Sequence, residues 1–463
     1  MSSAALLSDV VRGGGTEGLA AVEQAAPADA DGPGRAGLGA GALGHPAARD
    51  EAAVLGAAGL TQVARDVGGD AGAAGDAVCR KRAAARAGRR VGRGRRLAAA
   101  LCAAALLPPA PCGGRGRALA GEDGGPPARS EVPAPRGRVN HGPGLAYLPS
   151  GELLLCWYSA PAEADAGARI LCSRSADRGA GWSDPRVAVG PGDAAVGARE
   201  ANKSLGNVVL FADPGHQRLW MVHGVIQRWR VPVLGDLCRT WRCGRVDVRV
   251  SADAGRGWSA AARLDNGVGA LPRAGLLRHP GLGALLPLYR EGEETSHVRQ
   301  VEFGPAGLRL GPPLVVPARG VIQPSLVLQR DGRVRAFLRD TAAVAVRTAV
   351  LDPRSGRWGE AVATSLPNPG SAVDAFADDD GRFVVVHNPS RRDRRALRLA
   401  SSRDGIRFTP GCDLVAEGRE GEVAYPTAVR APDGAWHVAY SAHAKARIHH
   451  VRFGADWLRG CLG

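Results

Sequence analysis

From about residue 135 onward, short apolar runs alternate with turns rich in Gly, Pro and Asp, and no long stretch has helical periodicity. One pattern recurs there: an apolar run, a turn that contains Gly, and a second apolar run rich in aromatic residues. The first copy extends from Leu145 to Trp157 and has Gly151 in its turn. Runs of this kind, separated by a short polar turn, are typical of β-hairpins. The pattern therefore predicts an all-β protein.

Six copies of the hairpin pattern follow one another at intervals of 49 to 66 residues. Self-similarity at such a period indicates a solenoid or a propeller. Each hairpin is followed by a second pair of apolar runs, so each repeat is expected to form about four antiparallel strands, which is one blade. Six blades close into a six-bladed β-propeller, and we expect residues 131–140 to supply the strand that closes the ring with the C-terminus. The alternative is an irregular β-sandwich. The turn glycines are Gly151, Gly215, Gly281, Gly332, Gly381 and Gly434.

A second motif, S-x-D-x-G-x-x-W, occurs at Ser175–Trp182 and at Ser251–Trp258, each time directly after an apolar run. A weaker copy spans Ser402–Phe408, and a looser one spans Asp352–Trp358. Ser and Asp side chains bond backbone amides across a turn, and Gly takes a backbone angle that other residues resist. The aromatic residue then begins the next strand. Its recurrence supports a repeat.

The first 130 residues differ in composition, because Ala, Gly, Arg and Pro dominate and Trp, Tyr and Phe are absent. A packed core without aromatic residues is not expected. Residues 1–130 are therefore predicted to be a disordered low-complexity leader, and residues 131–463 are predicted to form the propeller.

A basic run from Arg80 to Arg96 leads into eleven apolar residues at 97–107, and an A-x-A sequence follows at 118–120. This order is typical of a secretory signal, so secretion or a secretory-pathway or organelle lumen is expected; without export the protein would be cytoplasmic. The apolar segment is short for a stable membrane span. Nucleic-acid binding is not expected, because the predicted propeller has no motif that combines basic and aromatic residues.

The cysteines also favour an oxidising compartment. After cleavage near Ala120 six would remain, and an even number fits disulfides, with ordinary buried thiols as the alternative. Cys238 and Cys243 flank a short loop and are candidates to pair. There is no C-x-x-C and no Cys/His cluster at zinc spacing, so no metal site is predicted. The six are Cys156, Cys172, Cys238, Cys243, Cys412 and Cys461.

Short proline- and polar-rich phrases add to the repeat at Leu286–Glu291, Ile322–Leu326, Leu366–Pro369, His387–Ser390 and Tyr425–Thr427. Together with the six hairpins and the turn motif, known as the Asp-box, they resemble the sialidase superfamily, also called neuraminidases or BNR-repeat proteins. The resemblance covers about residues 135–460. It implies that the Asp-boxes are structural turns on the outer rim. It also implies a site on the propeller axis, at the opposite end.

The resemblance further implies that three arginines bind the carboxylate of a sugar, that a Tyr paired with a Glu is the nucleophile, and that an Asp is the acid/base. Arginine offers a fork of donors that matches a carboxylate. A neutral Tyr avoids the repulsion that an anionic nucleophile would meet there, but it needs a base because its free pKa is near ~10. Tyr425 stands where the nucleophile is expected, and Arg339 stands where one arginine is expected.

Two positions depart from the family pattern. His141 replaces the first arginine, and Gln323 stands near where the base beside the tyrosine is expected. An amide cannot take a proton, so Glu422 or Glu291 would have to replace the base.

The acid/base residue and the third arginine stay open. Glu163 and Asp165 are the acidic candidates in the loop after the first hairpin. For every candidate a structural role is the alternative: packing for Tyr425 and His141, local pairing for Arg339, and solvated loop positions for the acids. Candidates for the third arginine are Arg273, Arg299 and Arg447.

These residues predict a sialidase-like exo-glycoside hydrolase that needs no cofactor. It would release a terminal sialic acid or a related acidic sugar from a glycan, glycoprotein or glycolipid. One alternative is a glycosidase of the same fold for another sugar, with His141 reshaping the pocket. The other is a carbohydrate-binding propeller without turnover, which the changes at His141 and Gln323 favour.

Overall fold

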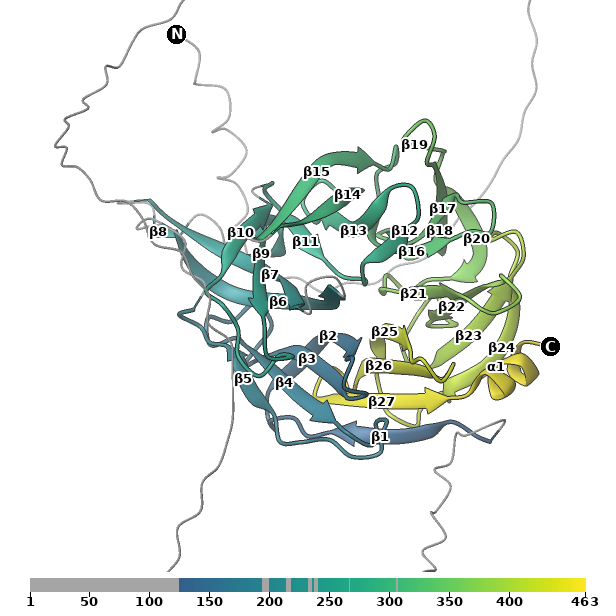
Figure 1. Ribbon diagram of the computed structural model, residues 1–463, viewed down its shortest axis with the longest axis horizontal. Helices are drawn as coiled ribbons and strands as arrows, with labels where there is room; N and C mark the ends of the chain where they lie inside the picture. Colours follow the sequence, from purple (N-terminus) through teal and green to yellow (C-terminus); the bar gives the residue numbers. More distant parts are fainter. Residues whose placement is uncertain are drawn as a thin grey trace, which may run out of the picture. The chain divides into compact units, whose positions relative to one another are not determined.

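The computed structural model describes residues 125–193, 200–213, 218–231, 235–236, 240–265, 267–304 and 307–463, and these residues are almost entirely β-strand (Figure 1). The strands form six antiparallel sheets that surround a common axis as the blades of a propeller. The predicted six-bladed β-propeller is therefore confirmed. The predicted leader up to residue 124, with its signal-like segment at 97–107, lies outside the described residues.

Each blade has four main strands, and the first strand of a blade is nearest the axis. Blade one contains β2 (Val139–Tyr147), β3 (Leu153–Ala160), β4 (Arg169–Ser175) and β5 (Arg186–Val189). Blade two contains β6 (Glu200–Asp213), β7 (Arg218–Val231), β9 (Gly244–Ser251) and β10 (Ala262–Asp265), with the short β8 (Gly235–Asp236) and the 3-10 turn η1 (Trp241–Cys243) between β7 and β9. Blade three contains β11 (Ala270–Pro272), β12 (Leu277–His279), β13 (Gly283–Arg290), β14 (Thr295–Gly304) and β15 (Gly307–Val315).

The second half of the ring repeats this plan. Blade four contains β16 (Val321–Leu328), β17 (Val334–Asp340), β18 (Ala345–Asp352), β19 (Arg357–Trp358) and β20 (Val362–Pro367). Blade five contains β21 (Asp374–Ala377), β22 (Phe383–His387), β23 (Leu397–Ser402) and β24 (Thr409–Val415). Blade six contains β25 (Ala424–Arg430), β26 (Trp436–Ala442), β27 (Arg447–Phe453) and β1 (Ala128–Val132).

The ring is closed by β1, which pairs antiparallel with β27, so that the first and last strands of the described chain share one sheet. The closing strand was predicted within residues 131–140 and lies a few residues earlier. Most of the predicted segment instead links β1 to β2. The reason is that β1 alternates between exposed and half-buried residues and buries only Val132 fully, so it has no apolar run that a sequence pattern can detect.

Among the described residues, six clusters of buried hydrophobic side chains each lie between two neighbouring blades, and a small seventh cluster of Leu271, Tyr289 and Ile322 joins blades three and four. Both faces of an inner strand are therefore buried, which explains why these strands are continuous apolar runs. In β13, Leu285 packs toward blade four and Leu286 toward blade two. In β22, Val385 packs toward blade four, whereas Val384 packs toward blade six.

The Asp-box turns connect the third and fourth strands of their blades. In the copy after β9, the Ser251 hydroxyl donates to Asp253 (2.7 Å) and accepts from the Gly255 N–H (2.7 Å), and Asp253 accepts from the Gly257 N–H (2.8 Å). Gly255 has a φ of 85°, which favours glycine. The aromatic residue, Trp258, packs into the cluster between blades one and two. The motif therefore fixes blade edges to their neighbours.

Two disulfides lie within the described residues. Cys156–Cys172 joins β3 to β4, and Cys412–Cys461 joins β24 to the C-terminal helix α1 (Ala455–Leu462). Cys243 is also disulfide-bonded, and Cys238, the partner predicted for it, lies outside the described residues. In the part of the chain that the structure describes, no helix is long and apolar enough to cross a membrane.

Candidate active site

Bulges in the innermost strands turn three polar side chains toward the propeller axis. The register shifts between His141 and Gly144 in β2, between Ile322 and Ser325 in β16, and between Ala424 and Thr427 in β25. Each bulge contains a proline, which has no N–H to give to the ladder. In all three the residue before the proline has a positive φ; in β2 it is Gly142 (63°), and in the other two it is a residue type for which this angle is rare. These are Gln323 (55°) and Tyr425 (58°).

A cavity of about 170 Å³ lies where the bulges meet. Every blade contributes to its lining, from the innermost strands, from the ends of second strands, or from the connections between second and third strands. The cavity therefore lies on the axis, at the end opposite the Asp-box turns. The lining residues are His141, Tyr158, Glu163, Asn207, Trp241, Tyr289, Glu291, Gln323, Arg339, Arg394, Tyr425 and Lys445.

The Tyr425 hydroxyl is held by two hydrogen-bond donors. Arg339 Nη1 and Gln323 Nε2 each lie 3.1 Å from it. Arg339 Nη1 also donates to Gln323 Oε1 at 3.4 Å, which fixes the orientation of the amide, and Gln323 Nε2 lies 3.3 Å from the Tyr289 hydroxyl. Because the phenol oxygen accepts from two donors, its own proton points away from both of them.

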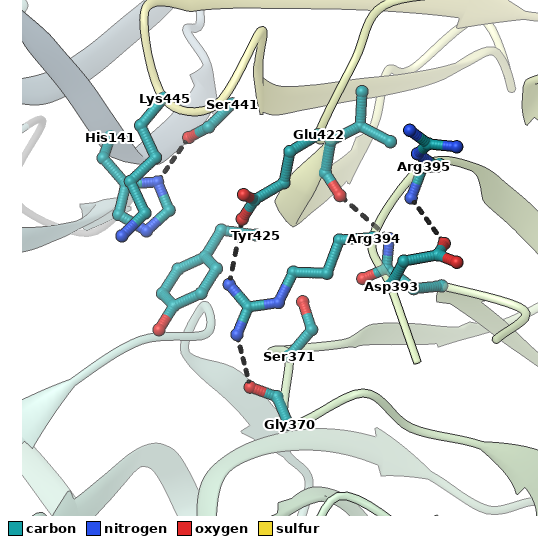
Figure 2. A network of polar contacts seen from close by, with 12 residues as sticks. His141, Gly370, Ser371, Asp393, Arg394, Arg395, Glu422, Tyr425, Ser441 and Lys445 are labelled. Atoms are coloured by element: carbon teal, nitrogen blue, oxygen red, sulfur yellow. Dashed lines mark hydrogen bonds and ion pairs between the residues drawn. The ribbon is translucent and has the colours of Figure 1, made fainter. Parts of the chain in front are cut away.

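His141 and Arg273 flank the ring of Tyr425. The His141 ring centroid is 4.1 Å from that of Tyr425, and its Nδ1 lies 2.7 Å from Ser441 Oγ (Figure 2). Burial, together with the nearby cations Lys445 and Arg273, holds the pKa of His141 well below its usual value, so the ring is neutral at physiological pH. Sequence reasoning predicted that His141 replaces a carboxylate-binding arginine; a neutral imidazole cannot supply that charge.

Arg273, one of the candidates for the third arginine, is buried under the site instead of facing the cavity. Its guanidinium carbon lies 5.0 Å from the Tyr425 ring centroid, and its Nη2 donates to the Pro426 carbonyl at 2.7 Å. Burial lowers its pKa, and the charge of Asp374 opposes that shift. A cation beneath an aromatic ring holds the ring in place. Arg273 therefore supports Tyr425 from behind.

Arg394 faces the cavity, although the sequence did not single it out. It lies in the connection between β22 and β23, where Nη2 donates to the Gly370 carbonyl at 2.8 Å and Nη1 lies 3.3 Å from Glu422 Oε1 (Figure 2). The available signal was the basic run 391–395, which follows a family-like phrase. The predicted candidate Glu422 is the partner of this arginine and lies beyond the cavity lining.

The other two arginine candidates lie elsewhere. Arg299 in β14 forms an ion pair with Asp265 at 2.9 Å and donates to the Gly311 carbonyl. Arg447 in β27 forms an ion pair with Glu131 in the closing strand at 2.5 Å. Both belong to third strands: Arg299 links blade three to Asp265 of blade two, Arg447 pairs within blade six, and neither lines the cavity.

The two loop acids also separate. Glu163 lines the cavity and pairs with Lys445 Nζ at 2.7 Å, whereas Asp165 accepts the Gly167 N–H at 2.7 Å and shapes the loop. Glu291 reaches the cavity from the turn after β13. The site thus brings together Tyr425, Arg339, Gln323, His141 and Glu163, and does not include Asp165, Arg299 or Arg447. Within the described residues, no group of acidic, His or Cys side chains is arranged to hold a metal ion.

Comparison with known proteins supports the architecture. A family model described as a BNR repeat-like domain matches residues 151–438. A protein of unknown function from Dyadobacter fermentans is 14% identical with a TM-score of 0.57, covering 70% of this chain and 97% of that one. The K499G mutant of NanB sialidase from Streptococcus pneumoniae is 12% identical with a TM-score of 0.54, covering 68% of each chain.

The intramolecular trans-sialidase from Ruminococcus gnavus is 11% identical with a TM-score of 0.55, covering 69% of this chain and 95% of that one. No curated protein sequence matches. At these identities the likeness shows the fold, and the chemistry has to be argued from the cavity itself.

Proposed function

The chain belongs to the BNR repeat-like domain family and is sialidase-like, and from that premise we propose that it is an exo-acting glycoside hydrolase. Its substrate would be a terminal sugar that carries a carboxylate, sialic acid or a related acidic sugar, on a glycan, glycoprotein or glycolipid. One observation carries the proposal: the Tyr425 hydroxyl lies in an axial cavity between Arg339 and Gln323, and both donate to it.

Arg339 is the best placed group to bind a substrate carboxylate. In the described part of the chain no carboxylate lies within ion-pair distance of it, and its Nε is buried without a hydrogen-bond partner. The structural alternative, pairing with Asp340, does not occur, because Asp340 accepts the backbone N–H groups of the next turn instead. A half-buried guanidinium that has no carboxylate partner gains most from a substrate carboxylate.

Arg394 is the second member of the proposed clamp. It lines the same cavity, and its present partner Glu422 is a half-exposed carboxylate that loses little when water replaces the arginine. Lys445 adds a third positive charge, although it is paired with Glu163. The cavity therefore favours an anionic sugar over a neutral one.

Tyr425 would act as the nucleophile. Its oxygen would attack the anomeric carbon while the bond from that carbon to the leaving oxygen breaks, and water would later release the sugar from Tyr425. The phenol proton needs an acceptor, and the Gln323 amide cannot be one. Glu163 is ion-paired to Lys445 and so is a carboxylate, the form that takes a proton.

The test is turnover by the full chain on 4-methylumbelliferyl glycosides of sialic acid, of uronic acids and of neutral sugars. We expect release from an acidic sugar that falls at least about 10³-fold in Tyr425→Phe, because the covalent route is lost. Tyr147→Phe, at the far end of β2, is the matched control and should retain activity. Release that survives in Tyr425→Phe would remove the nucleophile from the proposal.

A second function has its own supporting observation. The amide of Gln323 stands where a base would be needed beside Tyr425, and a pocket without that base suits binding without turnover. Sugar binding by the full chain, measured by calorimetry with N-acetylneuraminic acid, together with no release from any glycoside, would favour this function over hydrolysis.

A further inference from the structure

The two carboxylates that line the cavity have opposite surroundings. Glu163, between β3 and β4, forms an ion pair with Lys445 at 2.7 Å, and 47% of its side chain is exposed. Glu291, in the turn between β13 and β14, is half-buried, and its backbone N–H is fixed to the Gly269 carbonyl at 3.1 Å. Among the described residues, no side chain hydrogen-bonds or pairs with the Glu291 carboxylate. An unpaired carboxyl group in a protein cavity favours its neutral form.

The charges around Glu291 act from a distance and partly cancel. Burial raises the pKa of Glu291, and the negative charges of Glu294 in its own turn and of Glu163 across the cavity raise it further. Arg339 from β17 and Arg242 from η1 lower it. Tyr289, two residues earlier on β13, is neutral, because burial and the charge of Glu291 raise its pKa. The net direction is upward, so the carboxyl group keeps its proton to a higher pH than an exposed glutamate.

We propose that Glu291 is the catalytic acid of this site. The loop acid Glu163, which stands where the family pattern places the acid/base residue, then serves as the base. The assignment rests on the proposed hydrolase function. The geometry carries it: both groups line one cavity, one is held as a carboxylate by a lysine, and the other is turned into the cavity with no partner. Two carboxyl groups whose surroundings differ in this way are the usual acid and base of a glycosidase.

The proton balance is simple. As Tyr425 attacks, its proton passes to Glu163, and the Glu291 proton passes to the leaving oxygen, which takes the electron pair of the broken bond and departs as an alcohol. Glu291 is left as a carboxylate. In the second half of the reaction it takes a proton from the attacking water, while the bond from Tyr425 to the sugar breaks and the phenol regains its proton from Glu163.

Binding of an acidic substrate would increase the fraction of Glu291 that is protonated. Arg339 is the strongest of the cations that favour ionised Glu291. A substrate carboxylate bound to Arg339 offsets that positive charge and places a negative charge in the same cavity. Both effects favour protonated Glu291, so binding of an acidic sugar raises the fraction of the enzyme that can donate a proton. A neutral sugar would bring neither effect.

The first test compares leaving groups. Glu291→Gln in the full chain should lower kcat/KM about 10²–10⁴-fold on an alkyl-linked acidic sugar, such as sialyllactose, which needs a proton on its leaving oxygen. The loss should shrink to about 10-fold or less on a nitrophenyl glycoside, whose leaving group departs without one. Glu163→Gln should not show this dependence. Glu293→Gln, in the same turn and paired with Arg290, is the matched control and should retain both rates.

The second test is the pH profile. The fall in kcat and kcat/KM at high pH, the basic limb of the profile, should vanish in Glu291→Gln and persist in Glu163→Gln. It should also lie at higher pH in kcat than in kcat/KM, because kcat reports the enzyme with substrate bound. A basic limb that follows Glu163 instead, or equal loss on both leaving groups in Glu291→Gln, would overturn the assignment.

A third measurement does not need turnover. Carboxyl signals in infrared difference titrations of the full chain should include one that titrates above the usual glutamate range and is lost in Glu291→Gln. The same signal should move to higher pH when N-acetylneuraminic acid is added. If the carboxyl signal that disappears in Glu291→Gln titrates within the usual glutamate range, the proposal is rejected. Normal rates in Glu291→Gln with a dead Tyr425→Phe would reject only the acid, whereas a wild-type chain that cleaves no glycoside would reject the hydrolase as well.

Discussion

The outer turns and the axial bulges of this propeller both depart from regular strand geometry, and they are built in opposite ways. The Asp-box turns repeat one set of contacts: in two copies the Ser–Asp and Ser–Gly bonds are 2.7–2.8 Å long. The bulges share a proline and a register shift, but each presents a different side chain, His141, Gln323 or Tyr425. The same hydrogen bonds thus recur around the rim and hold the blades together, whereas each side chain presented at the axis occurs once.

The largest effect on activity is expected for a substitution in β17, a strand that reaches both the rim and the axis. Arg339 lies at the axial end of β17 and Arg335 toward the rim, where it contacts the Phe383 ring. Arg339→Lys should lower kcat/KM for an acidic glycoside about 10²–10³-fold, because an ammonium cannot replace the fork that holds Tyr425 and the substrate. Arg335→Lys is the matched control and should keep its activity. Similar losses in both variants would contradict the separation of rim and axis.

The next largest effect is on stability, and it is expected at two rim glycines that have the same backbone conformation. Gly179 (φ 86°) and Gly151 (φ 85°) both favour glycine, but a Cβ at Gly179 would lie 2.1 Å from the His450 ring, whereas at Gly151 it would meet only the Tyr147 hydroxyl at 3.8 Å. Gly151→Ala should cost about 1 kcal/mol of unfolding free energy, and Gly179→Ala about 3 kcal/mol. Urea unfolding measures both. Equal costs would show that the imidazole moves aside.

A third effect is the response of the ring closure to acid. His437 lies beneath the first Asp-box turn, 3.0 Å from His450. Burial lowers the pKa of His437 from 6.5 to about 4. In the unfolded chain histidine takes its proton near pH ~6.5, so stability is complete above that pH and falls, as the pH drops toward about 4, by about 1.4 kcal/mol per pH unit for this site.

His437→Gln should therefore reduce the slope of unfolding free energy against pH in this window by about 1.4 kcal/mol per pH unit, the contribution of one proton. The comparison is made by denaturant unfolding between pH 7 and pH 4.5, and His443→Gln, an exposed position in the same blade, is the control. An unchanged slope in His437→Gln would assign the acid sensitivity to other buried histidines.

The smallest effect is expected for a single rim hydroxyl. Ser251→Ala removes one donor to Asp253 and one acceptor for the Gly255 N–H, which should cost about 1 kcal/mol of stability. Activity should stay within about 2-fold of the original, because no cavity residue depends on this turn. A large loss of activity without a loss of stability would show that the rim influences the axis.

The fold can be predicted from the sequence because both faces of each inner strand are buried, so every repeat contains continuous apolar runs that the pattern reveals. The family resemblance points to Tyr425, Arg339, Gln323 and His141, which lie in strands whose place the repeat defines. Arg394 and Lys445 escape prediction because they lie in connections that differ from blade to blade. Arg299 and Arg447 attract attention wrongly, since a strand arginine looks the same in sequence whether it is in a second strand that ends at the axis or in a third strand.

The pairing of β1 with β27 has a consequence for biosynthesis. Ser130 and His450, which meet in the closed ring, are 320 positions apart in the chain. The ribosome makes β1 before the other strands of the propeller and β27 after them, so β1 stays without its partner strand while the other five blades are made. Contacts of such long sequence separation form slowly and leave strand edges open in the meantime. The nascent propeller therefore has an open edge at β1 until β27 has been made, and an open strand edge can pair with another chain.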